Sequence, residues 1–159
     1  MYTETDLKSI QSQLKKRSLA LLAPVAVLLA LFIYAYTLHL HRNESLAWLC
    51  YLSLLLLALL VIFCDSLFLS PLRAYKRHLK DALYGRTREL KGLFKSLDST
   101  PCLRDNVAFY PLIISEGDLN NEEDDRLFYF DATKPFPLLS VGTGVTVISN
   151  DKRVSNLIV

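Results

Sequence analysis

The sequence predicts an α+β membrane protein, in which a transmembrane hairpin of two helices precedes a short amphipathic basic helix and a small β-barrel. Two uninterrupted apolar runs, at residues 18–40 and 46–69, are each long enough to cross a bilayer, which takes about 20 helical residues. A basic segment with helical spacing follows them. Beyond Gly85 the apolar residues take the spacing of short strands. These patterns divide the chain into a membrane part and a polar part.

The first apolar run follows an N-terminal segment, residues 1–17, whose short apolar stripe indicates an amphipathic helix that continues into the span. In the span itself, residues 18–40, alanines recur at helical spacing, and small residues so placed let another helix approach closely. The second span is the expected neighbour, because the short connection forces an antiparallel hairpin. Alanine is also common in membrane helices without a packing role. The residues predicted for helix packing are Ala23, Ala26 and Ala30.

The distribution of basic residues predicts the orientation of the hairpin. Basic residues precede the first span and follow the second span, residues 46–70, whereas the loop at residues 41–45 carries one arginine and one glutamate. By the positive-inside rule, the loop faces outward and both termini are cytoplasmic, as in a multi-pass protein of the cell membrane. Aromatic residues typical of a bilayer interface lie at the outer ends of both spans: Tyr34, Tyr36, Trp48 and Tyr51.

One carboxylate, Asp65, lies inside the apolar runs. A charge at the bilayer midplane is costly and in most cases functional. Asp65 comes late in the second span, however, which places it near the cytoplasmic headgroups. We therefore expect either an interfacial position or a polar contact with a partner subunit or a transported species.

The segment at residues 71–85 has the composition of a helix that lies along the inner leaflet. Ser70 and Pro71 predict its start, as N-cap and first helical residue, and Gly85 predicts its end. Apolar residues follow the helical period, basic residues occupy the other faces, and His78 is expected at the surface. The alternative is a continuation of the second span. The residues predicted to bind the membrane surface are Arg73, Lys76, Arg77 and Lys80.

The polar half, residues 86–159, predicts five short strands. The first, at residues 86–97, also fits a helix, but Gly92 favours a bent strand. The second contains Pro111, which restricts it to a sheet edge or a bulge. Five short strands in so small a domain favour a closed barrel without exposed edges, OB-type ahead of SH3-like. The remaining strands are expected at residues 107–115, 126–131, 145–149 and 154–159, with a hairpin turn between the last two.

The last two of these strands carry a recognisable pattern. Gly142, Val145 and Val147 form a Gly-x-x-Val-x-Val run, and an apolar strand at residues 154–159 follows it. This ending resembles the barrels of the nodulation-efficiency-D family of prokaryotic membrane proteins. The resemblance implies a membrane-anchored OB domain that acts as a scaffold or regulatory module, and it implies no catalytic residue. Members of that family have more spans and associate with stomatin-like partners, so the two spans of this chain depart from the family pattern.

An acidic segment at residues 116–125 contains six carboxylates. Polar and acidic residues alternate from Asp118 to Asp124 like the start of a calcium loop, but Glu123 stands where an EF-hand needs glycine. We therefore expect a solvated tip or a docking point for a basic partner. The residues predicted for such a contact are Asp65, Glu122, Glu123, Asp124 and Asp125.

The remaining motifs argue against catalysis. Cysteine and histidine spacings match no zinc site, and neither a phosphate loop nor a nucleophile elbow is present. We expect no catalytic, metal-binding or cofactor-binding residue, and no nucleic-acid partner, because residues 99–159 carry nine acidic and five basic side chains.

The sequence therefore predicts a non-enzymatic interaction or regulatory module of a membrane assembly. Its expected partners are the lipid bilayer and either another membrane protein or a second copy of the chain. One alternative is a membrane-tethered OB-type domain that binds nucleic acid or a small ligand. The other alternative is an accessory subunit of a transporter, which depends on Asp65.

Overall fold

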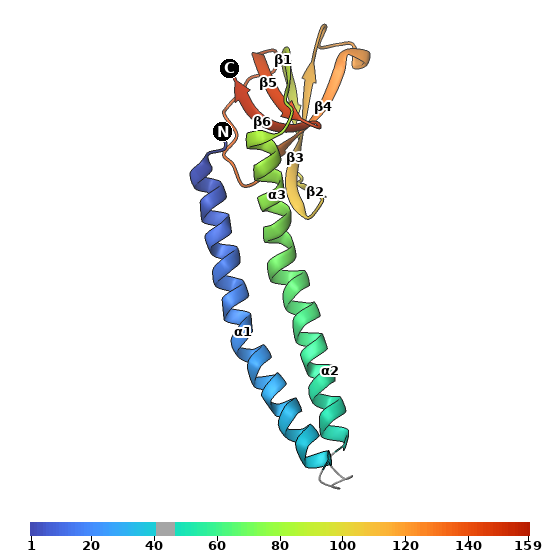
Figure 1. Ribbon diagram of the computed structural model, residues 1–159. Helices are drawn as coiled ribbons and strands as arrows, with labels where there is room; N and C mark the ends of the chain where they lie inside the picture. The colour runs from blue at the N-terminus through green and yellow to red at the C-terminus, as the bar shows by residue number, and fades with distance from the viewer. Residues whose placement is uncertain (41–46) are drawn as a thin grey trace. The chain divides into compact units, whose positions relative to one another are not determined.

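The computed structural model describes residues 1–40 and 47–159 of the chain (Figure 1). It divides them into two compact units. The helical unit comprises Gln11–Arg73, and the sheet domain comprises Met1–Ile10 together with Ala74–Val159. The predicted outer loop at residues 41–45 lies outside the described residues.

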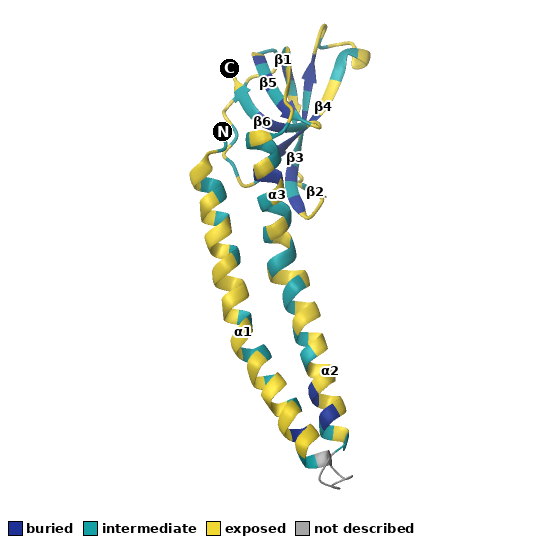
Figure 2. Ribbon diagram, in the orientation of Figure 1, coloured by how far each residue is buried: buried dark blue, intermediate teal, exposed yellow. Residues whose placement is uncertain are grey.

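Two long helices carry the apolar runs. The first is α1, Glu4–Leu40, which joins the N-terminal segment to the first predicted span without a break. The second is a helical stretch from Ala47 to Tyr84, and both helices are long and apolar enough to cross a membrane. Most of their apolar side chains are exposed (Figure 2). The second stretch consists of α2 (Ala47–Cys64), a π-helical turn (Asp65–Leu69) and α3 (Ser70–Tyr84).

The start of α3 differs from the prediction. Ser70 has helical backbone angles (φ −59°, ψ −48°), and its N–H donates to the carbonyl of Asp65, five residues earlier. Ser70 is therefore inside a helix and is no N-cap, so the predicted start is wrong. Pro71 has no N–H, and a proline ring crowds the carbonyl four residues before it. The wider π turn immediately before Pro71 gives that ring room, and the backbone continues. The helix ends after Tyr84, next to Gly85, as predicted.

Within the helical unit, α1 and α2 run side by side (Figure 1). Each presents one stripe of less exposed residues. Both helices line shared cavities, one of them next to Phe32 and Cys50. Spacings of three and four residues keep each stripe on one helix face. The stripe of α1 consists of Leu21, Val25, Leu28, Phe32 and Ala35, and that of α2 of Cys50, Ser53, Leu57, Leu60 and Cys64.

The predicted packing residues Ala23, Ala26 and Ala30 are exposed, so the expectation that they face the second span is wrong. At about 100° of rotation per residue, they lie on the side of α1 opposite to the stripe that begins at Leu21. The larger residues of that stripe occupy the side toward α2. The alanine face stays uncovered.

The sheet domain contains six strands. All five predicted strands are present, and residues 88–97 form a strand rather than a helix. The additional strand β2 is short and pairs with β3 across Asp105 and Asn106, which both have positive φ. The strands are β1 (Arg88–Leu97), β2 (Cys102–Arg104), β3 (Val107–Ser115), β4 (Asp125–Asp131), β5 (Gly144–Asn150) and β6 (Arg153–Ile158).

The strands pair in the order β1-β5-β6-β4-β3-β2, and β1 also pairs with β3. All pairings are antiparallel except that of β4 with β6. Strand β1 changes partner near Gly92, from β5 to β3. A Cβ at Gly92 would lie 2.4 Å from the carbonyl oxygen of Ser115 and 2.7 Å from Cγ2 of Ile114. Glycine therefore allows β1 to pass this close to β3, as its predicted role in a bent strand requires.

Strand β3 is an interior strand, so the expectation that Pro111 places it at a sheet edge is wrong. The β1–β3 pairing does contain an irregularity, between Phe94 and Ser96 of β1. One side of β3 pairs with β4, and the other side pairs first with β2 and then with β1. Pro111 falls between these last two partners, where no backbone N–H is needed. Its carbonyl still accepts a hydrogen bond from the N–H of Asp98 at 2.9 Å.

The core of the sheet domain has two parts. The larger part contains Phe94, Leu112, Ile114, Phe128, Phe130, Val145, Val147 and Val154, and Phe136 packs edge-on against Phe130. In the smaller part, Ala74 and Tyr75 of α3 pack against Val107, Phe109 and Tyr129 of the sheet. His78 and Leu79 of α3 are also buried, at 2% and 0% exposure. The apolar face of α3 thus covers the sheet rather than lipid, and the expectation of a surface histidine is wrong.

Candidate functional site

The sheet domain contains a group of polar side chains around a buried carboxylate, and they come from the N-terminal segment, from α3 and from the end of β4. We call it the Asp131 cluster: Tyr2, Tyr75, His78, Asp131 and Thr133. Tyr2 precedes α1, Tyr75 and His78 lie on the inner face of α3, and Asp131 ends β4. Asp131 itself is fully buried. A buried carboxylate is costly unless its oxygens are satisfied, so its partners matter.

Four donors satisfy the Asp131 carboxylate. Oδ2 accepts from the hydroxyls of Tyr75 at 2.9 Å and of Tyr2 at 3.1 Å. Oδ1 accepts from the hydroxyl of Thr133 at 2.7 Å and from its backbone N–H at 2.8 Å. Hydrogen bonds to an ionised acceptor are stronger than neutral ones. Three of the four donors that stabilise the negative charge of Asp131 are therefore hydroxyl groups.

His78 extends this network as a neutral ring. Its Nε2 lies 2.9 Å from the hydroxyl oxygen of Tyr2. Because Tyr2 donates its only hydroxyl proton to Asp131, Nε2 carries the proton that the Tyr2 oxygen accepts. The ring packs edge-on against Phe109, with centroids 5.1 Å apart. Burial lowers the pKa of His78, and the charge of Asp131 only partly opposes this.

Burial acts in the opposite sense on the two tyrosines. It raises the pKa of Tyr75 to about 12. It also raises the pKa of Tyr2, and the neighbouring Asp131 charge adds to that effect. Both hydroxyls therefore stay protonated and remain donors at neutral pH. The cluster thus serves to fasten residues before α1 to α3 and β4.

Two exposed or half-exposed contacts reinforce this attachment. Lys134 forms a salt bridge of 2.9 Å with Asp6. The hydroxyl of Tyr84 donates to Glu4 at 3.1 Å. The first turns of α1 are thereby joined both to α3 and to the segment after β4.

We expect the stability of the sheet domain to fall as the pH drops below about 6.5, the ordinary pKa of histidine. The pKa of His78 is lower in the folded than in the unfolded chain, so the unfolded chain takes up a proton first. Protonation of His78 then favours unfolding. The stabilisation that neutral His78 contributes above pH 6.5 is lost as the pH falls toward the pKa of His78 in the folded chain. Thermal unfolding at about pH 7.5 and about pH 5.5 measures this. In a His78→Gln variant the unfolding temperature should depend less on pH than in the parent chain. If both chains show the same pH dependence, another titratable group causes it.

The basic residues predicted to bind the membrane surface have different surroundings. Arg73 forms a salt bridge with Asp65, and both side chains are about half exposed. Lys76 is half-buried, whereas Arg77 and Lys80 are exposed. The pairing with Arg73 gives Asp65 a partner within the helical unit, and the accessory transporter subunit stays an alternative prediction.

The acidic segment is partly occupied with its own structure. The Asp124 carboxylate accepts from the N–H of Asp118 at 3.3 Å and from the side chain of Asn121 at 3.1 Å. Asp125 forms a salt bridge of 2.7 Å with Lys95. Of the predicted contact residues in this segment, Glu122 and Glu123 are exposed. Over residues 1–40 and 47–159, no group of three or more His, Cys, Asp or Glu side chains is placed to hold a metal ion.

The members of the Asp131 cluster were not predicted from the sequence. Tyr2 and Asp131 are separated by 129 positions, so no local pattern relates them. One weak local signal existed, because an aspartate two residues before Thr133 can form an Asx turn. The burial of Asp131 depends on α3, which no pattern within β4 reveals.

Three comparisons with known proteins give no relative. No family model, no curated protein and no solved structure matches the chain. Its function is therefore argued from its own geometry and chemistry.

Proposed function

We propose that the chain is a two-pass protein of the cell membrane whose sheet domain is a non-enzymatic interaction or regulatory module of a membrane assembly. The observation that carries the proposal is the apolar surface of the two long helices. Val27 on α1 and Ile62 on α2 are 68% and 67% exposed, and apolar residues of similar exposure surround them. A bilayer would cover this surface, whereas water would not solvate it without a large cost.

We further propose that the sheet domain is an OB-type barrel rather than an SH3-like one. The pairings form a ring, β1-β3-β4-β6-β5, that returns to β1. The first three strands of that ring follow one another as an antiparallel meander, and β6 lies parallel to β4. This order is typical of OB-type barrels. It also agrees with the OB domain that the resemblance to the nodulation-efficiency-D family implies, which stays a prediction.

The charge distribution supports a cytoplasmic position for the sheet domain and both termini. Basic residues precede the first apolar run and follow the second, and by the positive-inside rule these two flanks face the cytoplasm. Arg77 and Lys80 are exposed and available to anionic headgroups. Arg73 contributes less, because Asp65 neutralises it.

The partner would reach the chain at two places. Ala23, Ala26 and Ala30 form an exposed small-residue face on α1, which suits a helix of another membrane protein or of a second copy. The exposed Glu122 and Glu123 suit a basic soluble segment.

Crosslinking in native membranes tests this proposal. We expect the full chain to crosslink to a partner or to itself through α1, and the double variant Ala26→Leu and Ala30→Leu to lower the yield several-fold. Ala58→Leu is the matched control, because Ala58 is an exposed alanine of α2. It should leave the yield unchanged.

A reporter placed after Val159 tests the orientation in the same cells. Protection from reagents outside intact cells is the expected result. Labelling from outside, or a chain that remains monomeric and uncrosslinked, would overturn the proposal.

A further inference from the structure

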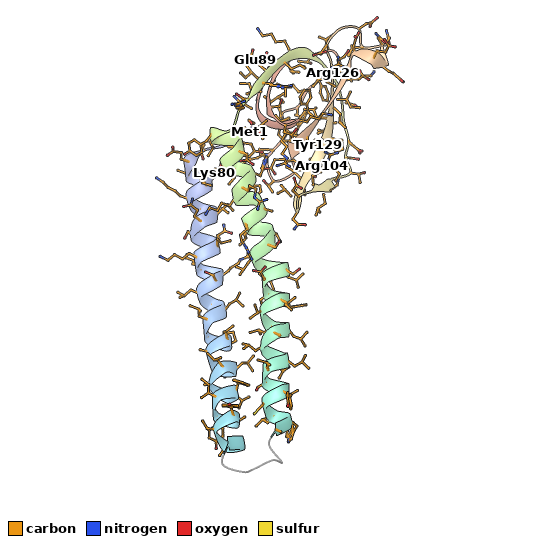
Figure 3. The ribbon with its side chains drawn as sticks, turned by 45° about the vertical axis from the view of Figure 1, so that its right-hand side comes forward. Met1, Lys80, Glu89, Arg104, Arg126 and Tyr129 are labelled. Atoms are coloured by element: carbon orange, nitrogen blue, oxygen red, sulfur yellow. The ribbon has the colours of Figure 1, made fainter. Side chains whose placement is uncertain are left out.

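The sheet domain has an open cleft of about 650 Å³ where the start of β1, the start of β4 and the β5–β6 hairpin meet. Four basic side chains line it, Arg86, Arg88, Arg126 and Lys152, with two acidic ones, Glu89 and Asp151. Leu90 and Phe128 supply its apolar lining. Figure 3 labels two of these residues, Glu89 and Arg126. The cleft lies within one unit of the chain, so its geometry does not depend on the helical unit.

Two of the six charges are already paired. Arg126 forms a salt bridge of 2.9 Å with Glu116 and donates to the carbonyl of Glu123 at 3.0 Å. Glu89 lies 3.9 Å from Lys91 across an exposed contact. In the part of the chain that the structure describes, Arg86, Arg88 and Lys152 form no salt bridge. The cleft thus has an excess of positive charge, with Asp151 as its remaining free carboxylate.

The backbone segments that carry these cations are tied to one another. The side-chain amide of Asn150 donates to the carbonyl of Arg86 at 2.9 Å, which joins the start of β1 to the hairpin. Arg88 lies opposite Ser149 in the β1–β5 ladder. The carbonyl of Lys152 accepts from the N–H of Tyr129 at 2.8 Å, which joins the hairpin to β4. The backbone positions of three exposed basic residues are therefore fixed around one cleft before any ligand arrives.

We propose that this cleft binds a ligand that carries two or more phosphate groups. Two of the three unpaired cations are arginines, whose planar guanidinium groups match phosphate oxygens in a bidentate manner. A cleft of this volume is in the range of small-molecule sites, so the ligand is a small molecule or a headgroup rather than a folded protein. The phosphates would neutralise the cations, whose mutual repulsion the single free carboxylate of Asp151 only partly offsets. The ligand would be either a free polyphosphate compound or the headgroup of a phosphorylated lipid.

Calorimetric titration of the purified full chain with inorganic tripolyphosphate tests the proposal. We expect saturable binding that weakens with added salt. Arg88→Gln and Lys152→Gln should each lower the affinity tenfold or more. Arg104→Gln is the matched control, because it removes the same charge from an exposed residue of β2 that does not line the cleft, and it should change the affinity less than twofold. Circular dichroism of each variant establishes that the sheet domain is folded.

A second arm distinguishes the two sources of phosphate. Full chain in nanodiscs that contain a phosphorylated inositol lipid is compared with chain in phosphatidylserine nanodiscs of equal total charge. If the lipid headgroup occupies the cleft, tripolyphosphate will bind more weakly in the nanodiscs that contain the phosphorylated inositol lipid than in the phosphatidylserine nanodiscs.

Three results would overturn the proposal: no binding in either arm, equal weakening by Arg104→Gln, or equal competition by an acidic peptide of the same charge. None of these depends on a protein partner, so such a failure leaves the crosslinking test of the proposed function intact.

Discussion

Replacement of Gly92 by alanine will destabilise the sheet domain by about 3 kcal/mol, the upper part of the usual range for overpacking. The added Cβ would lie 2.4 Å from the carbonyl oxygen of Ser115, a backbone atom of β3. That oxygen cannot move without disturbing the pairing of β1 with β3, since Ser115 pairs with Leu93. Near-ultraviolet circular dichroism during thermal unfolding of the full chain measures this loss. The unfolding temperature should fall by roughly 4–8 °C per kcal/mol for a domain of this size.

Gly144→Ala is the matched control for this substitution. Gly144 is also in a strand, and a Cβ there would meet no atom within 4 Å. We expect no loss of stability, or a small gain because alanine restricts the unfolded chain. If Gly92→Ala unfolds at the same temperature as Gly144→Ala, then β1 does not pass close to β3 in solution and the proposed ring of strands is wrong.

Asp131→Asn will have the second large effect and will lower the free energy of unfolding of the sheet domain by about 3 kcal/mol. A hydrogen bond to a buried charged acceptor contributes about 1.5–3 kcal/mol, and removal of that acceptor leaves its donors unsatisfied. The asparagine amide has one acceptor oxygen where the carboxylate has two. Its NH₂ group would face either the two tyrosine hydroxyls or the hydroxyl and N–H of Thr133. The backbone N–H of Thr133 cannot rotate, so the amide oxygen stays with it and the tyrosine side loses its acceptor.

Hydrogen exchange distinguishes this loss from general destabilisation. The N-terminal turns of α1 should exchange faster in Asp131→Asn, because Tyr2 loses its charged partner. Asp151→Asn is the control, since Asp151 is exposed in the β5–β6 turn with φ 44°, a conformation that asparagine accepts. Unchanged exchange in the first turns of α1 would mean that the Asp131 cluster does not hold them.

Local patterns predicted most of the secondary structure. Strand β3 has the bounds that its apolar and β-branched residues predict, and the hairpin turn falls at Asp151 and Lys152, which both have positive φ. The apolar runs predicted two long helices. These features depend on neighbours a few residues away, which a single sequence displays directly.

The errors share one cause. Ser70 has the chemistry of an N-cap, yet the π turn before Pro71 lets the helix continue. Pro111 suits an edge strand, yet β3 changes partners beside it and remains interior. In each place the local signal was real, but the backbone groups were satisfied in another way: by a π turn within the same helix at Ser70, and by a change of partner strand at Pro111.

The sequence by itself determined the two long helices able to cross a bilayer, five of the six strands in their order, and the segregation of charge. The tertiary structure alone decided which faces are covered. It placed the apolar face of α3, with His78, on the sheet, left the alanine face of α1 exposed, and brought Tyr2 to Asp131. Periodicity states that a helix has an apolar face, but the surface that covers it comes from distant residues whose positions only the folded chain defines.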